Sequence, residues 1–390
     1  MRQAQSPAAR YTPRMAGPFR RALAVLVAGG VGAAAGLPPV SNTKPAGPTA
    51  RPVWNTAPAV CGEPTRPTLT ASPLPGTVSG RVAFYAAEYA PTTQRVIRSV
   101  GLGALNELQP VASTYKPVVV ELALRDVDAG RLSLNTPFTT TAANRSIEAY
   151  PPGTHTLVDL AKRAIVRSDN TAGDILQQAV GTQRVALSLR WRSPCTSVLL
   201  TSKAAWAAQG FLQSAVLGDD LLSGAHSYFA LPFAERVAVA TRLNANAARF
   251  TGPEVEAAID SYFRGPLYDP FIDLAFQHTS TAKAYADLVA RVYGGNNLQP
   301  GTRRLFRDLL SQGCCHPRTS PLNATYWGAK AGSGWRLLTL TGLVEMPGGR
   351  TFAYAYLNDG SDTLEAEDME AQIPAVVTWI EQNLRTLAGK

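Results

Sequence analysis

The sequence Ala-Ser-Thr-Tyr-Lys-Pro at residues 112–117 is followed at once by a nearly unbroken apolar run, Val118–Leu124. A run of this kind predicts a buried helix, and Gly130 marks its end. Ser113 would then lie at the start of the helix, with Lys116 one turn later on the same face. A lysine amine within hydrogen-bond reach of a serine hydroxyl activates that hydroxyl as a nucleophile.

The Ser-x-x-Lys spacing also has an ordinary structural explanation. A serine at the start of a helix commonly caps it by accepting a hydrogen bond from a free backbone N–H. The same spacing occurs at Ser41–Lys44, in a proline-rich stretch, and at Ser280–Lys283. The assignment of Ser113 as a nucleophile therefore depends on other motifs.

Two further polar motifs follow along the chain. The first, Ser168-Asp-Asn170, lies in a predicted turn between two helices, where short polar side chains either cap the second helix or face a cleft. A capping box at Thr156 and Asp159 begins the preceding helix. The second motif, Lys330-Ala-Gly-Ser-Gly334, lies on or beside a predicted strand.

In this order, Ser-x-x-Lys, Ser-Asp-Asn and Lys-x-Gly resemble the signature motifs of class A β-lactamases and penicillin-binding proteins. The resemblance extends from about Arg81 to Leu387. It implies an α+β, β-lactamase/transpeptidase-like fold. In that fold, an antiparallel sheet is built from both ends of the domain, with flanking helices and an inserted all-helical subdomain.

The residue patterns predict a similar arrangement. Residues 81–87 and three segments near the C-terminus have the composition of strands, residues 93–108 have the spacing of a helix, and residues 365–387 form a closing helix. We therefore expect one domain at 76–390, with an α/β part at about 76–110 and 326–390 and a helical part at about 111–325.

The N-terminal region predicts export. Residues 1–37 resemble a signal peptide, because arginines precede an apolar run that is too short to span a membrane. Residues 38–75 are rich in proline and predict a linker. We expect a periplasmic or extracellular monomer with no stable membrane span after processing. The net charge of +9 arises mostly within residues 1–66, so nucleic acid is not an expected partner.

The four cysteines, Cys61, Cys195, Cys314 and Cys315, suit an oxidising compartment. Adjacent cysteines rarely bond each other, so we favour a disulfide from Cys195 to Cys314 or Cys315, with free buried thiols as the alternative. Neither the cysteines nor the four histidines have the spacing of a zinc site. No metal or cofactor is expected.

The resemblance implies a role for each motif. Ser113 would attack a carbonyl carbon, Lys116 would take its proton, and Ser168 would pass a proton to the leaving nitrogen. Asn170 would hold the substrate's amide. Lys330 would attract the substrate's carboxylate and help to lower the pKa of Lys116 by like-charge repulsion.

The resemblance also places an oxyanion hole at the backbone N–H groups of Ser113 and Ser333, with Gly332 and Ser333 contacting the substrate. One residue departs from the family pattern. Ala331 replaces the usual hydroxyl residue, which weakens the expected grip on a substrate carboxylate.

A second departure concerns deacylation. Hydrolytic class A enzymes use a glutamate on a loop that corresponds here to about residues 262–278. That loop contains no glutamate, and only Asp269 and Asp273 remain as possible deacylation bases. A missing general base costs about 10² to 10⁴ in rate, so efficient lactam hydrolysis is not implied.

Three functions therefore compete. The first is an exported serine hydrolase that acts through an acyl-Ser113 enzyme on β-lactams or related cell-wall amides. The second is a D,D-peptidase or esterase without efficient β-lactam hydrolysis. The third is a non-catalytic binding protein on the same fold, which the intact polar groups of all three motifs disfavour.

Processing of the leader is testable. Cleavage should leave a mature N-terminus between about Ala35 and Ala50, since the apolar run ends there. Intact-mass measurement of protein recovered outside the cytoplasm checks this. A mass that still includes Met1 or Met15 would contradict export with processing.

Overall fold

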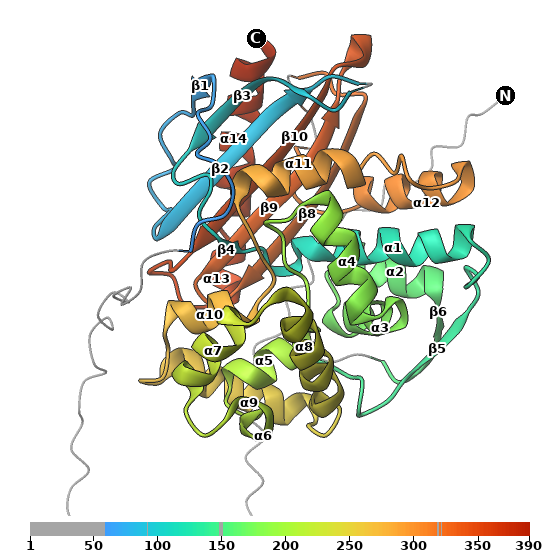
Figure 1. Cartoon of the computed structure of the whole chain (residues 1–390). Helices are drawn as coiled ribbons and strands as arrows, with labels where there is room; N and C mark the ends of the chain where they lie inside the picture. Colours follow the sequence, from blue (N-terminus) through green and yellow to red (C-terminus); the bar gives the residue numbers. More distant parts are fainter. Residues whose placement is uncertain (1–58, 92, 148–150, 318–319, 321) are drawn as a thin grey trace, which may run out of the picture. The chain divides into compact units, whose positions relative to one another are not determined.

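The computed structural model describes residues 59–390, except residues 92, 148–150, 318–319 and 321. Its main sheet has six strands in the order β1-β3-β2-β10-β9-β8 (Figure 1). Two small sheets pair β4 with β7 and β5 with β6. The strands are β1 (Leu69–Thr70), β2 (Arg81–Tyr89), β3 (Val96–Leu102), β4 (Gln109–Pro110), β5 (Pro137–Thr140), β6 (Gly153–Thr156), β7 (Thr279–Ser280), β8 (Tyr326–Gly334), β9 (Leu337–Glu345) and β10 (Thr351–Asp359).

Both ends of the domain contribute to the sheet, as predicted. Strand β2 pairs antiparallel with β10, and Tyr85 lies opposite Ala355. Strands β9 and β10 form the predicted hairpin through Pro347–Gly349. The short strand β1 pairs in parallel with β3, so part of the segment expected to be a linker belongs to the sheet.

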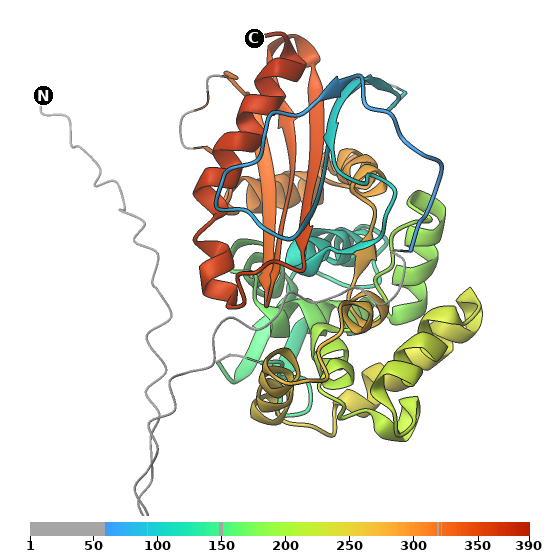
Figure 2. The same ribbon diagram turned by 90° about the vertical axis from the view of Figure 1, so that its left-hand side faces the viewer.

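The helices lie on both faces of the sheet and in a separate group beyond its end (Figures 1 and 2). They are η1 (Ala112–Tyr115), α1 (Lys116–Asp128), α2 (Leu157–Val166), α3 (Asn170–Val180), α4 (Thr182–Arg192), α5 (Ser202–Gln209), α6 (Ser214–Leu217), α7 (Leu221–Ala230), α8 (Phe233–Ala247), α9 (Gly252–Arg264), α10 (Pro270–Phe276), α11 (Ala282–Val292), α12 (Pro300–Ser311), η2 (Pro347–Gly349), α13 (Ala366–Glu370) and α14 (Ile373–Ala388).

Successive side chains of β2 point to opposite faces of the sheet, and both faces are buried. Phe84 packs on the face covered by α14, where its ring contacts Trp379 with 4.8 Å between centroids. Tyr85 points to the opposite face and shares a core with α11 and α1. A third core holds the apolar faces of α5, α7, α8, α9 and α10 together, which is the predicted helical subdomain.

The helix predicted at residues 93–108 is wrong. Strand β3 occupies its middle, Val96–Leu102, and pairs with β2, with Val100 opposite Ala86. Gly101 lets the Leu105 side chain pack closely against this strand, because a Cβ atom there would lie 2.9 Å from Leu105 Cδ1. Pairing with a distant strand overrides the local helical spacing.

The favoured disulfide is also wrong. Cys195 bonds Cys61, and Cys314 bonds its neighbour Cys315. The chain around Cys61 also lies against residues 106–108, where the Cys61 N–H donates to the Asn106 carbonyl over 2.8 Å. Sequence spacing could not reveal this contact.

The predicted signal peptide lies outside the described residues, as does the linker up to residue 58. Among the residues that the structure describes, no helix is long and apolar enough to cross a lipid bilayer.

Candidate active site

The 3₁₀ turn η1 places Ser113 directly before α1. Its hydroxyl accepts a hydrogen bond from the Lys116 ammonium over 2.8 Å. No side chain caps either η1 or α1, so helix capping does not explain Ser113. Ala112 has a φ of +43°. Residues other than glycine rarely adopt this backbone conformation, and those that do cluster at functional sites.

Lys116 joins the first two motifs. Its side chain is fully buried, and its Nζ donates to Asn170 Oδ1 over 2.7 Å and to the Ser168 carbonyl oxygen. The Ser168 hydroxyl lies 3.4 Å from the same nitrogen. Gly173 makes this approach possible, because a side chain there would lie 3.2 Å from Lys116 Cε.

The three residues of the Ser-Asp-Asn motif have different contacts. Asp169 caps α3 by accepting a hydrogen bond from the Ala172 N–H over 2.9 Å. Ser168, with a φ of +57°, and Asn170 turn instead toward Lys116. The N-cap explanation therefore fits only the middle residue.

The competing Ser280–Lys283 pair forms no such cluster. The Ser280 hydroxyl bonds Thr196 over 2.7 Å, and Lys283 pairs with Asp287 over 2.6 Å. The other match, Ser41–Lys44, lies outside the described residues.

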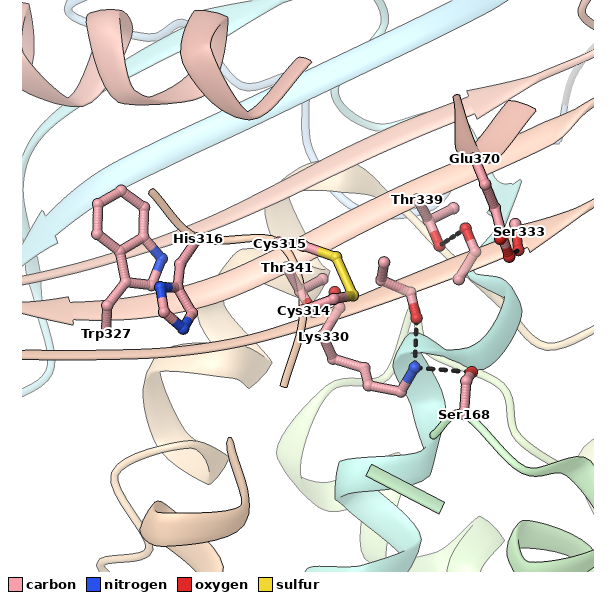
Figure 3. Close-up of a disulfide and its surroundings, with 12 residues drawn as sticks. Ser168, Cys314, Cys315, His316, Trp327, Lys330, Ser333, Thr339, Thr341 and Glu370 are labelled. Atoms are coloured by element: carbon pink, nitrogen blue, oxygen red, sulfur yellow. Dashed lines mark hydrogen bonds between the residues drawn. A yellow bond between two sulfur atoms is a disulfide. The ribbon is translucent and has the colours of Figure 1, made fainter. Parts of the chain in front are cut away.

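Lys330 approaches from the edge strand β8. Its side chain is 2 % exposed, and its Nζ donates to the Ser168 hydroxyl over 2.8 Å (Figure 3). Burial lowers the pKa of Lys330 well below its usual value, and the charge of Lys116 lowers it further, while Glu370 opposes the shift. The expected like-charge repulsion thus acts on Lys330 itself.

Gly332 lets β8 lie against the backbone of Ser113. A side chain at this position would lie 2.5 Å from the Ser113 backbone nitrogen. The Thr339 hydroxyl on β9 fixes the same approach by donating to the Val111 carbonyl over 3.0 Å. Only glycine permits this contact, which places the Ser113 N–H beside the strand that carries Ser333.

Sequence reasoning missed Asp174 on α3. This buried carboxylate accepts backbone hydrogen bonds from Ser202 over 2.7 Å and Lys203 over 2.9 Å. Burial raises its pKa to about 6, although these bonds and the charge of Lys116 lower it. Its position four residues after Asn170, on the same helix face, could have revealed it.

His278 and Glu370 were also missed. The buried ring of His278 lies on Tyr115, with 3.8 Å between ring centroids, and burial lowers its pKa to about 3. Glu370 on α13 accepts a hydrogen bond from the Ser333 hydroxyl over 2.5 Å. Both contacts join segments that are distant in sequence, so no local pattern marks them.

The two candidate deacylation bases lie on α10. Asp269 caps that helix through the Phe271 N–H at 2.7 Å. Asp273 is buried and accepts hydrogen bonds from Gln209 over 2.6 Å and Tyr262 over 3.0 Å. Within the described part of the chain, no hydrogen bond joins either aspartate to Ser113.

Comparison with models of protein families identifies the family of this chain. A model of the beta-lactamase enzyme family matches residues 98–196 and 242–379, which include all three motifs and more than half of the chain. The chain belongs to this family. A comparison with curated proteins found no significant match.

The chain is also similar to several solved structures at low identity. An ancestral class A β-lactamase of Gram-negative bacteria is 18% identical, with a TM-score of 0.47, covering 78% of this chain and 94% of its own. A β-lactamase from Xanthomonas campestris is 18% identical, with a TM-score of 0.48, covering 79% and 93%. A variant of PBP-A, solved as its acyl-enzyme with penicillin G, is 15% identical, with a TM-score of 0.48, covering 80% and 92%.

The site of this β-lactamase family member is built from hydroxyl, amine and amide groups. Among the described residues, no group of three or more His, Cys, Asp or Glu side chains could hold a metal ion. The Ser113 hydroxyl contacts the Lys116 amine, and the Ser168 hydroxyl lies between the amines of Lys116 and Lys330.

Asp273 makes stability depend on pH. Burial raises its pKa from 3.8 to about 8, although the hydrogen bonds from Tyr262 and Gln209 lower it. The folded protein thus keeps a proton that the unfolded chain releases above about pH 4, so this group's contribution to stability falls as the pH rises from about 4 to about 8. Asp273→Asn should raise the Tm at about pH 8 and change it little at about pH 4, as thermal unfolding at both pH values would show.

Asp269→Asn is the matched control, because this residue caps the same helix and asparagine caps equally well. We expect it to leave the pH dependence nearly unchanged. Equal pH dependence in wild type and Asp273→Asn would contradict the buried protonated aspartate.

Proposed function

We propose that this protein is an exported serine hydrolase that acts through an acyl-Ser113 enzyme on β-lactams or related cell-wall amides. The observation that carries the proposal is the buried Lys116 amine, which lies 2.8 Å from the Ser113 hydroxyl and contacts both Ser168 and Asn170. A purely structural lysine would not need a hydroxyl nucleophile among its partners.

The hydrogen bonds of Lys116 suit a general base. The Ser168 carbonyl and Asn170 Oδ1 can only accept, so a neutral amine directs its two protons to them. Its lone pair then faces the Ser113 hydroxyl. Lys116 can take the Ser113 proton as Oγ attacks the carbonyl carbon, which turns the amine back into an ammonium.

Ser168 links the two lysines and would protonate the leaving group. Its hydroxyl lies 2.8 Å from the Lys330 nitrogen and 3.4 Å from that of Lys116. As the bond to the leaving nitrogen breaks, Ser168 gives its proton to that nitrogen and regains one from a lysine ammonium. Repulsion between two buried ammonium groups favours this transfer.

Backbone N–H groups of Ser113 and Ser333 would stabilise the oxyanion. The contact at Gly332 supports this assignment, because it holds the Ser113 nitrogen against β8. Each such donor is worth about 10² to 10³ in rate.

Two observations favour a D,D-peptidase or esterase activity as the second candidate. Ala331 lacks the hydroxyl that would help to hold a substrate carboxylate, and the Ser333 hydroxyl is bonded to Glu370. The polar cluster around Lys116 disfavours the third candidate, a binding protein without catalysis, since burying such groups is costly for a fold that does not use them.

The role of Ser113 can be tested by covalent labelling. Ser113→Ala should abolish labelling by a fluorophosphonate or a fluorescent penicillin, because the variant lacks the attacking oxygen. In-gel fluorescence measures the label, and Ser280→Ala serves as the control, since its motif lies outside this cluster. Labelling that survives in Ser113→Ala would remove Ser113 from this role.

Deacylation can be tested separately. Because no carboxylate among the described residues is hydrogen-bonded to Ser113, a β-lactam supplied at high concentration should acylate Ser113 and remain attached for many minutes. Intact-mass spectra should show the adduct, and a chromogenic cephalosporin should show a burst with little turnover.

Rapid steady turnover would contradict slow deacylation and favour a true β-lactamase. Asp269→Asn and Asp273→Asn would then each be tested for trapping of the acyl-enzyme. Hydrolysis of simple esters with neither adduct nor β-lactam turnover would support the esterase.

A further inference from the structure

A carboxylate of the protein lies beside the hydroxyl that was expected to contact the substrate. Ser333 Oγ donates a hydrogen bond to Glu370 Oε1 over 2.5 Å, and Figure 3 shows the two side chains pointing toward one another. Glu370 is exposed, and its charge acts on Lys330. A negative charge therefore lies at the end of β8 that carries Ser333.

Within the described part of the chain, Glu370 forms no salt bridge, although its charge acts on Lys330. Glu367 and Asp368 are exposed on the same short helix. Two arginines of neighbouring segments have other partners: Arg264 pairs with Glu365 over 2.8 Å, and Arg336 donates to the Ser361 carbonyl over 2.9 Å. Helix α13 thus adds acidic groups to this end of the strand.

Of the groups expected to hold a substrate carboxylate, both hydroxyls are occupied or absent, and the Lys330 amine already makes two hydrogen bonds. The Lys330 amine donates to the Ser168 hydroxyl and to the Ala331 carbonyl. Ala331 carries no hydroxyl, and the Ser333 hydroxyl is bound to Glu370. A substrate carboxylate at this position would meet another carboxylate in place of a donor.

We infer that Glu370 is a specificity-determining residue that makes this end of the site select substrates with a neutral or cationic leaving group and reject those with a carboxylate there. The inference rests on the proposed acyl-Ser113 chemistry. Among the candidate substrates it favours those of the esterase over β-lactams, because a β-lactam carries a carboxylate beside its leaving nitrogen. A carboxylate lone pair accepts hydrogen bonds from an amide and attracts a cation, whereas two carboxylates repel at a partly solvated surface by an amount that changes kcat/KM by about tenfold.

A series of thioesters tests the charge preference. The acyl group is kept constant, and the leaving thiol is mercaptopropionate, its amide, or thiocholine. Ser113 Oγ forms an ester with the acyl carbon, the C–S bond breaks, and the departing thiol takes the proton delivered by Ser168. The released thiol is measured with a chromogenic thiol reagent.

We expect the wild type to cleave the thiocholine and amide thioesters with kcat/KM values about tenfold or more above that of mercaptopropionate. Glu370→Gln should raise kcat/KM for mercaptopropionate and lower it for thiocholine, so that the ratio approaches one. Glu367→Gln is the control, because it removes the same charge from the same helix. It should leave the ratio close to the wild-type value.

Several outcomes would overturn the inference. They are a wild type that prefers mercaptopropionate, a ratio that Glu370→Gln leaves unchanged, and an equal change in Glu367→Gln. If these occur while a fluorophosphonate still labels Ser113, the inference alone fails. If no thioester is cleaved and no label attaches to Ser113, the proposed function fails with it.

Discussion

The buried amine of Lys116 is the constraint on which the site depends. A charged or polar nitrogen with no exposed surface is stable in a protein only when its hydrogen bonds are satisfied. Its partners come from two places, Ser113 before α1 and the turn at 168–170 between α2 and α3. Packing of α1 against α3 is therefore tied to the positions of the groups that would perform the chemistry.

The edge of the sheet completes this arrangement through a second buried amine. Lys330 on β8 reaches the Ser168 hydroxyl, and Gly332 allows the same strand to touch the Ser113 backbone. The two lysines share one hydroxyl, so each disfavours the charge of the other. A fold that holds two amines in this way keeps both of them close to the hydroxyls of Ser113 and Ser168.

Carboxylates are distributed around this centre and not within it. Asp174 fixes the start of α5 through backbone hydrogen bonds, and Asp273 is buried within the helical subdomain. Neither bonds Ser113, which agrees with a long-lived acyl-enzyme. Glu370 lies at the outer end of β8 and changes the charge that a substrate meets there. The groups proposed for acylation, for deacylation and for specificity thus lie on different elements of one fold.

The sequence by itself determined what depends on short-range spacing. The Ser113 and Lys116 pair, the Ser168 turn and the closing hairpin follow from residues a few positions apart, because helix and turn geometry fixes such neighbours. The tertiary structure decided β3, the Cys61 disulfide and the contact of Ser333 with Glu370. These depend on which distant segments pack together, and a local pattern carries no information about a partner that only the folded chain brings near.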